Sequence, residues 1–118
     1  MIRNQDDWLT GQIDTIIKLL AQLYFQDSKA ITCLDESEKR SFYQEAMTLM
    51  EKQAYQQLNQ LLLEKAETRS KETLKLALHI YGRFNRLSDE ELEKGAFSHN
   101  RLYGAVQELE KIYTNFFF

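Results

Sequence analysis

The sequence predicts an all-α protein, a single compact bundle of five or six antiparallel helices that spans residues 1–118 as one domain. No proline and only four glycines occur among 118 residues, so almost nothing in the chain interrupts an α-helix. Apolar residues recur three or four positions apart nearly throughout, as in helices with one buried side. With 43% hydrophobic and 28% charged residues, the chain is expected to fold without disulfides or metal ions.

The first helix is expected from Asp6 to Phe25, with Asn4 or Asp6 as its N-cap. Its apolar side begins with Trp8 and is expected to face the core. At 100° per residue the same side carries Leu9, Ile13, Ile16, Ile17, Leu20, Leu23 and Tyr24.

The next two helices are separated by a weak boundary. Residues Asp35–Glu38 form a capping box, so a helix is expected from Ser37 to Lys52, followed by another from Ala54 to Ala66. Because no glycine or proline marks the boundary, one continuous helix from Ser37 to Ala66 is the alternative. Such a helix would be longer than is usual in globular proteins.

The fourth helix is expected from Ser70 to Arg86, with Thr68 or Ser70 as its cap. Its apolar side chains cover an arc of roughly 200°, which is much wider than the stripe of a surface helix. This helix should therefore be central. The arc comprises Leu74, Leu76, Ala77, Leu78, Ile80, Tyr81, Phe84 and Leu87.

Two further start signals follow. Ser88 is expected to cap a short helix, with Glu91 closing the capping box, and Gly95 is expected to adopt the left-handed conformation that ends it. Ser98 repeats the cap for a last helix that runs to about Asn115. The apolar stripe of this last helix is narrow, which is typical of a helix packed around the outside of a bundle.

Charge and cysteine content exclude several classes of function. The formal net charge of -3 argues against a nucleic-acid partner, which would require a surplus of Lys and Arg. Neither a signal peptide nor a membrane-spanning segment is recognisable, so no membrane association is expected. Because Cys33 is the only cysteine, no intramolecular disulfide can form. These features predict a cytoplasmic protein.

No motif of catalytic or metal-binding spacing is visible, so no catalytic residue, cofactor or metal site is assigned and the protein is expected not to be an enzyme. His79 and His99 are twenty residues apart on different expected helices. The acidic residues from Asp89 to Glu93 are explained by the start of a helix, where the macrodipole favours negative charge.

The fourth helix also carries a basic face, which comprises Lys71, Lys75, His79, Arg83 and Arg86. In an acidic chain, this face is the candidate site for an acidic protein partner. The alternative is that these charges are solvated or paired with carboxylates such as Glu72, Glu45 or Glu51.

The segment Phe116, Phe117 and Phe118 is the candidate for self-association. Consecutive side chains are about 100° apart on a helix, so these rings cannot all lie on one stripe. They either pack on their own subunit, near Trp8 or Phe25, or form a homodimer contact.

Two stretches resemble a known family. They are residues 4–13, from Asn4 through Trp8 to Ile13, and a later segment that begins at Tyr81, includes Leu87-Ser88-Asp89-Glu90-Glu91-Leu92 and ends at Phe97-Ser98. They are similar to a family of small uncharacterised proteins of Gram-positive bacteria (Firmicutes), a domain of unknown function. The resemblance implies a helical fold over nearly the whole chain and brings no catalytic residues.

The middle of the chain also resembles a tetratricopeptide helical hairpin. The repeat's early Trp-Leu-Gly residues and its terminal proline are missing, and fewer than three repeats are present. The residues at hairpin-like spacings are Tyr43, Ala46, Leu49, Tyr55 and Leu58, and a second set is Ala77, Tyr81 and Phe84.

These observations predict a non-catalytic, cytoplasmic protein-interaction module that binds another protein or itself. The alternative is a small-molecule-binding or enzymatic bundle. Its pocket would lie between the fourth and sixth helices and would be lined by Tyr81, His79, Arg83 and Tyr103.

Overall fold

The computed structural model describes residues 3–26 and 42–115, and within them all the regular structure is helical, with no strand. The all-α prediction is therefore confirmed. The helices are α1 (Arg3–Phe25), α2 (Tyr43–Glu51), α3 (Tyr55–Ala66), α4 (Lys71–Arg86), α5 (Asp89–Glu93) and α6 (His99–Thr114).

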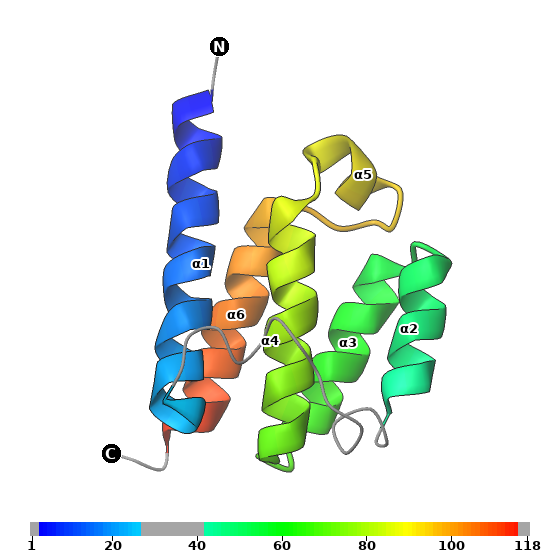
Figure 1. The fold of residues 1–118 in the computed structure, drawn as a ribbon. Coiled ribbons are helices and arrows are strands. Elements are labelled where there is room, and N and C mark those ends of the chain that lie inside the picture. The colour runs from blue at the N-terminus through cyan, green and yellow to red at the C-terminus, as the bar shows by residue number, and fades with distance from the viewer. Residues whose placement is uncertain (1–2, 27–41, 116–118) are drawn as a thin grey trace.

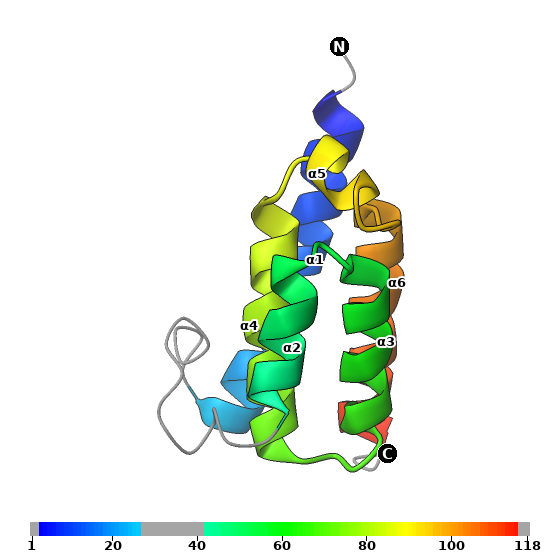
Figure 2. The ribbon, with the colours of Figure 1, turned by 90° about the vertical axis from the view of Figure 1, so that its right-hand side faces the viewer.

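The helices pack in two layers beside α1 (Figures 1 and 2). α4 and α2 form one layer and α3 and α6 the other, while the short α5 lies over the end of the bundle where α6 begins. α1 packs along α6 and α4, and α3 packs against α2, α4 and α6. α4 therefore lies between α1 and α3, which confirms that the fourth helix is central.

The core is built around the wide apolar arc of α4. Complete burial of one Leu or Ile side chain stabilises a fold by about 1.5–3 kcal/mol, so this helix contributes a large share of the hydrophobic stabilisation. Its buried residues are Thr73, Leu74, Leu76, Ala77, Leu78, Ile80, Tyr81 and Phe84.

Two buried hydroxyl groups fix the helices relative to one another. Tyr81 on α4 donates a 2.7 Å hydrogen bond to Asn59 Oδ1 on α3, and Tyr113 on α6 donates a 2.6 Å bond to the Ser70 carbonyl. Tyr24 at the end of α1 donates in turn to the Tyr113 carbonyl. Burial raises the pKa of both Tyr81 and Tyr113 well above the ordinary value of 10.0. Both phenols therefore remain neutral donors at physiological pH.

Three predicted serine caps are confirmed. Ser70, Ser88 and Ser98 each accept a hydrogen bond from the backbone N–H three residues ahead, at 3.2, 3.2 and 3.1 Å. The cap predicted for the first helix is wrong, because α1 begins at Arg3 and so contains both Asn4 and Asp6. Arg and Gln, which stand at positions 3 and 5, are good helix formers, which is consistent with the earlier start.

The boundary between the second and third helices is a true break, so the continuous alternative is wrong. Gln53 has a φ of 58° and therefore lies in the left-handed region. Its N–H donates to the Met50 carbonyl, and the Ala54 N–H donates to the Leu49 carbonyl. This pair of bonds is a Schellman motif, a common helix end in which the left-handed residue is usually glycine. Here Gln53 holds that position.

The assignment of Gly95 as the left-handed residue is wrong. Ala96 holds that conformation, with a φ of 58°, and no described glycine has a positive φ. Gly95 is needed for a different reason. A Cβ there would lie 2.3 Å from the Gln53 carbonyl oxygen and 2.7 Å from the Tyr55 nitrogen, so only glycine allows the α5–α6 loop to approach the α2–α3 turn.

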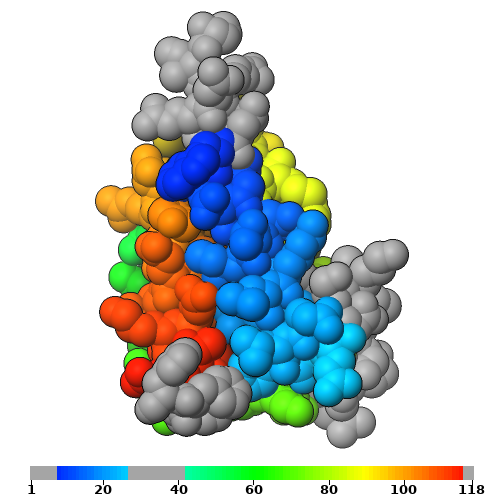
Figure 3. Space-filling model, turned by 90° about the vertical axis from the view of Figure 1, so that its left-hand side faces the viewer, coloured from blue at the N-terminus to red at the C-terminus, as the bar shows by residue number. Residues whose placement is uncertain are grey.

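The apolar side of α1 is only partly covered by the other described helices, and in Figure 3 α1 runs along the surface of the molecule beside α6. Trp8, expected to begin the core-facing side, is 57% exposed and contacts the Tyr103 ring edge-on, with ring centroids 6.1 Å apart. Leu23, expected on the same side, is also exposed. The expectation is wrong for both residues because the apolar arc of α1 is wider than the surface that α4 and α6 present to it.

Several predictions lie outside the described residues. They concern Cys33, the capping box Asp35–Glu38 and the segment from Phe116 to Phe118. The described part of α2 begins at Tyr43, so the predicted start at Ser37 also lies outside. Within the described residues, none of the helices has the length and apolarity that crossing a membrane requires.

Candidate functional site

The structure places the five predicted basic residues along one face of α4. Four of them are spaced by four residues, so they follow one another along the helix surface. Lys71, Arg83 and Arg86 are exposed, whereas Lys75 and His79 are half-buried. The Lys75 ammonium lies 5.7 Å from the centre of the Phe25 ring, a cation–π distance.

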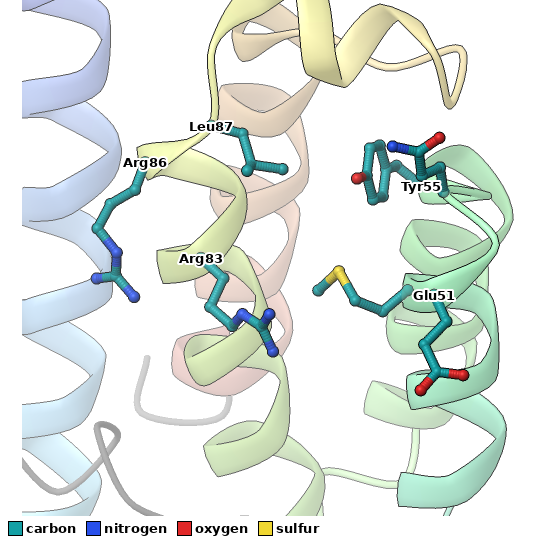
Figure 4. A pocket seen from close by; sticks show the side chains of 7 residues that line it. Glu51, Tyr55, Arg83, Arg86 and Leu87 are labelled. Atoms are coloured by element: carbon teal, nitrogen blue, oxygen red, sulfur yellow. The ribbon is translucent and has the colours of Figure 1, made fainter.

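A groove of about 450 Å³ lies where this face meets α2 (Figure 4). Arg83 extends into the space between α4 and α2, whereas Arg86 extends toward α1. The groove combines the Arg83 guanidinium with apolar and amide side chains and the Glu51 carboxylate, and Arg86 lies at its rim. Its lining residues are Met50, Glu51, Gln53, Tyr55, Arg83, Arg86 and Leu87.

An aromatic cluster holds the walls of the groove together. The Tyr55 ring on α3 contacts Phe84 on α4 edge-on, with centroids 5.1 Å apart, and Phe84 contacts Phe97 at 5.4 Å. The Gln56 N–H at the start of α3 donates a 3.0 Å bond to the Gly95 carbonyl. The α2–α3 turn is therefore fastened to both α4 and the α5–α6 loop, which sets the separation of α2 from α4.

The arginines of the groove are available for an external anion. Within residues 3–26 and 42–115, neither Arg83 nor Arg86 forms an ion pair with a carboxylate, and Glu51 across the groove is not within ion-pair distance of either. Of the alternative in which the basic face is solvated or paired with carboxylates, the pairing with acidic residues of the second helix is therefore not observed for these two arginines, both of which are exposed. A planar guanidinium binds a carboxylate through two parallel N–H bonds, so the groove is suited to acidic groups.

The apolar and amide residues of the groove were not identified from the sequence as part of a site. Met50 and Tyr55 fit the helical periodicity, and Leu87 fits a hydrophobic staple before Ser88. Met50 and Arg83 are more than thirty residues apart in the sequence, so only the tertiary fold brings them to one groove.

The two histidines lie in different surroundings. His99 is buried at the start of α6, where its Nδ1 lies 2.5 Å from Asp89 Oδ1 and its Nε2 lies 3.4 Å from the Asn85 carbonyl oxygen. His79 lies on the basic face. In the described part of the chain, no group of three or more His, Cys, Asp or Glu side chains could hold a metal ion. The His99–Asp89 pair fastens α5 to α6.

A second groove, of about 560 Å³, lies between α3 and α6. It belongs to the layer opposite α4, and its charged groups are carboxylates (Figure 2). The two layers thus present grooves of opposite charge. The lining residues of this groove are Gln60, Leu63, Glu64, Glu67, Glu108 and Ile112.

The four residues of the alternative pocket are dispersed. Tyr81 is fully buried and bonded to Asn59, Arg83 lines the groove beside α2, and Tyr103 contacts Trp8 on the α1 side. His79 is half-buried on the basic face of α4.

Residues 3–114 match the model of a family of unknown function, DUF6483. The chain belongs to this family. The match spans the six helices of the described residues and confirms the predicted membership of a family without an assigned function. No curated protein and no solved structure gives a match.

Proposed function

We propose that this DUF6483 protein is a non-catalytic interaction module that binds an acidic segment of a partner protein. The binding surface is the basic face of α4 together with the α2–α4 groove. The observation that carries the proposal is the arrangement of Arg83 and Arg86 beside apolar side chains, without an ion-pair partner among the described residues.

The chemistry of the groove favours a peptide with both carboxylates and apolar side chains. Arg83 supplies a planar, always-charged donor, while Met50 and Leu87 supply apolar contact area beside it. Methionine adapts its shape to different apolar partners, which is useful at a recognition surface. Lys71 and Lys75 extend the positive potential along α4 and would speed the encounter with an acidic partner.

Two further features support a binding role in place of catalysis. The lining of the α2–α4 groove includes no His, Cys, Ser or Thr, so it lacks the usual nucleophile and base pair. Its volume is within the range of ligand sites, and its residues are those that anchor protein interfaces. The tetratricopeptide-like hairpins, the Firmicutes source and the cytoplasmic location remain predictions.

The test is direct binding of fluorescent peptides measured by anisotropy. One peptide alternates glutamate with leucine, and a second has the same length with lysine in place of glutamate. The acidic peptide is expected to bind and the basic peptide is not. Arg83→Glu is expected to weaken binding at least tenfold, because a hydrogen bond to a charged group contributes about 1.5–3 kcal/mol.

Arg101→Glu is the matched control. Arg101 is exposed on α6 outside the groove, and the substitution changes the net charge by the same amount. Equal weakening by Arg83→Glu and Arg101→Glu would show that only overall charge matters, and the proposed site would be wrong.

A further inference from the structure

The α2–α4 groove has charged side chains of opposite sign on its facing walls. Arg83 extends from α4 into the space between the helices, and Glu51 lies on α2 across from it (Figure 4). Both residues are exposed, and in the described part of the chain neither forms an ion pair with the other or with a third residue. The groove thus offers one group for an anion and one for a cation, and the two do not bind each other.

The position of Glu51 is unfavourable for α2 itself. Glu51 is the last residue of this helix, and the last turn contains no basic residue. The C-terminus of a helix carries a partial negative charge, so it repels a carboxylate and would attract a lysine. Residues that break such a local rule are typical of functional sites. The stability of α2 therefore does not explain a glutamate at this position.

Apolar and aromatic side chains line the same groove as the two charges. Met50 precedes Glu51 on α2, Tyr55 is the first residue of α3, and Leu87 follows the end of α4. The volume of about 450 Å³ is near the lower end of the range for ligand sites, so a segment of chain bound there is short. The charged and apolar side chains of that segment must therefore lie close together in its sequence.

We infer that the acidic segment of the partner also carries a lysine or arginine, and that Glu51 selects it. The inference rests on the proposed function, because Arg83 binds a carboxylate of the segment in the same complex. The cation then binds Glu51, and an apolar side chain of the segment contacts Met50. A segment with acidic residues alone would place a carboxylate against Glu51, and this repulsion would weaken its binding. Glu51 therefore discriminates among acidic segments.

A double-mutant cycle between peptide and protein tests this selection. The first peptide alternates glutamate with leucine, and the second has lysine in place of the central glutamate. Anisotropy gives the ratio of the two affinities for each protein. In Glu51→Gln, this ratio is expected to shift about two- to fivefold toward the all-glutamate peptide, because an exposed ion pair with the lysine is lost.

Glu45→Gln is the matched control for this cycle. Glu45 is exposed on the same helix but does not line the groove, and the substitution changes the net charge by the same amount. The ratio of the two affinities is expected to stay unchanged in this variant.

Thermal unfolding separates selection from a structural role. Glu51→Gln is expected to keep or raise the unfolding temperature, because it removes a negative charge from the C-terminus of α2. A lower temperature would show that the fold itself needs Glu51 and would count against the inference. An equal shift of the ratio in Glu51→Gln and Glu45→Gln, or a shift in neither, would overturn the inference, while Arg83-dependent binding of the acidic peptide would still support the proposed function. Failure of both peptides to bind would refute the proposed function and this inference together.

Discussion

α4 and α1 have wide apolar arcs, yet the two helices meet very different surroundings. Leu74, Leu76 and Leu78 on α4 are at most 1% exposed although they point in different directions. On α1, Leu20 is fully buried, whereas Leu19 beside it is 45% exposed. A leucine is thus buried where its side of the helix faces another helix and exposed where that side faces none. Apolar periodicity identifies a helix and the width of its arc, and tertiary packing decides how much of that arc is buried.

The position of each helix in the bundle explains the contrast. α4 has α1 on one side and α3 and α6 on the others, so nearly every apolar side chain finds a partner. α1 stands at the edge of the described bundle, and its main contacts there are with α6 and α4. The apolar surface that α1 leaves exposed includes Trp8, Leu19 and Leu23.

Matched truncations of leucine measure this contrast directly. Leu78→Ala on α4 is expected to lower the free energy of unfolding by about 2–5 kcal/mol, because it leaves a cavity in a closed core. Leu19→Ala on α1 is expected to change it by about 0.5 kcal/mol or less, because this side chain is largely exposed. Urea unfolding followed by circular dichroism gives both values. Equal losses would mean that α1 is as deeply packed as α4.

Removal of a phenolic oxygen tests the same contrast between the core at α4 and the edge at α1. Tyr81→Phe is expected to cost about 1–3 kcal/mol, because Asn59 would keep a buried acceptor without a donor. Tyr103→Phe, on the half-buried side that faces Trp8, is expected to cost less than about 0.5 kcal/mol. A cost for Tyr81→Phe as small as that for Tyr103→Phe would show that the buried hydrogen bond adds nothing.

The buried phenols of α4 and α6 also predict a loss of stability at alkaline pH. Burial raises the pKa of Tyr81 and Tyr113 in the folded state, whereas in the unfolded chain both titrate near 10. The two tyrosines contribute fully to the free energy of unfolding below pH 10. Above pH 10 they ionise in the unfolded chain first, so the free energy of unfolding falls by up to about 1.4 kcal/mol per pH unit for each tyrosine. Urea unfolding at several pH values is expected to show this slope, and Tyr113→Phe is expected to reduce it.

A substitution at the end of α1 is expected to have the smallest effect, and it should raise the stability of the protein where the others lower it. Gln26 has a φ of 57°, a left-handed conformation that glycine adopts without strain. Gln26→Gly is therefore expected to stabilise the protein by about 0.5–1 kcal/mol. Gln22→Gly, one turn earlier and inside the helix, is expected to destabilise it by a similar amount. Thermal unfolding of both variants decides whether the conformation at Gln26 carries a cost.

Local signals explain which parts of the fold were predictable. The serine caps at Ser70, Ser88 and Ser98 depend on a few adjacent residues, so the starts of α4, α5 and α6 could be predicted from the sequence. The helix ends were harder, because Gln53 and Ala96 adopt the conformation usually given to glycine. Nothing in their own side chains signals this conformation.

The candidate site was predictable only in part. The basic face follows from the four-residue spacing along α4, because those residues lie on one helix. The groove also needs Met50 of α2 and Tyr55 of α3. Its width, the separation of α2 from α4, depends on the close approach of Gly95 to the α2–α3 turn. No local pattern encodes that approach.

The pairing of α1 with α6 has a consequence for biosynthesis. These helices form the most extensive contact in the described structure, although more than seventy residues separate them. During translation, the ribosome releases α1 long before its main partner exists, so the core-facing side of α1 stays in water while the intervening helices emerge. The nascent chain cannot complete its core until α6 has left the exit tunnel. Bringing the two helices together then carries the entropic cost of closing a long loop.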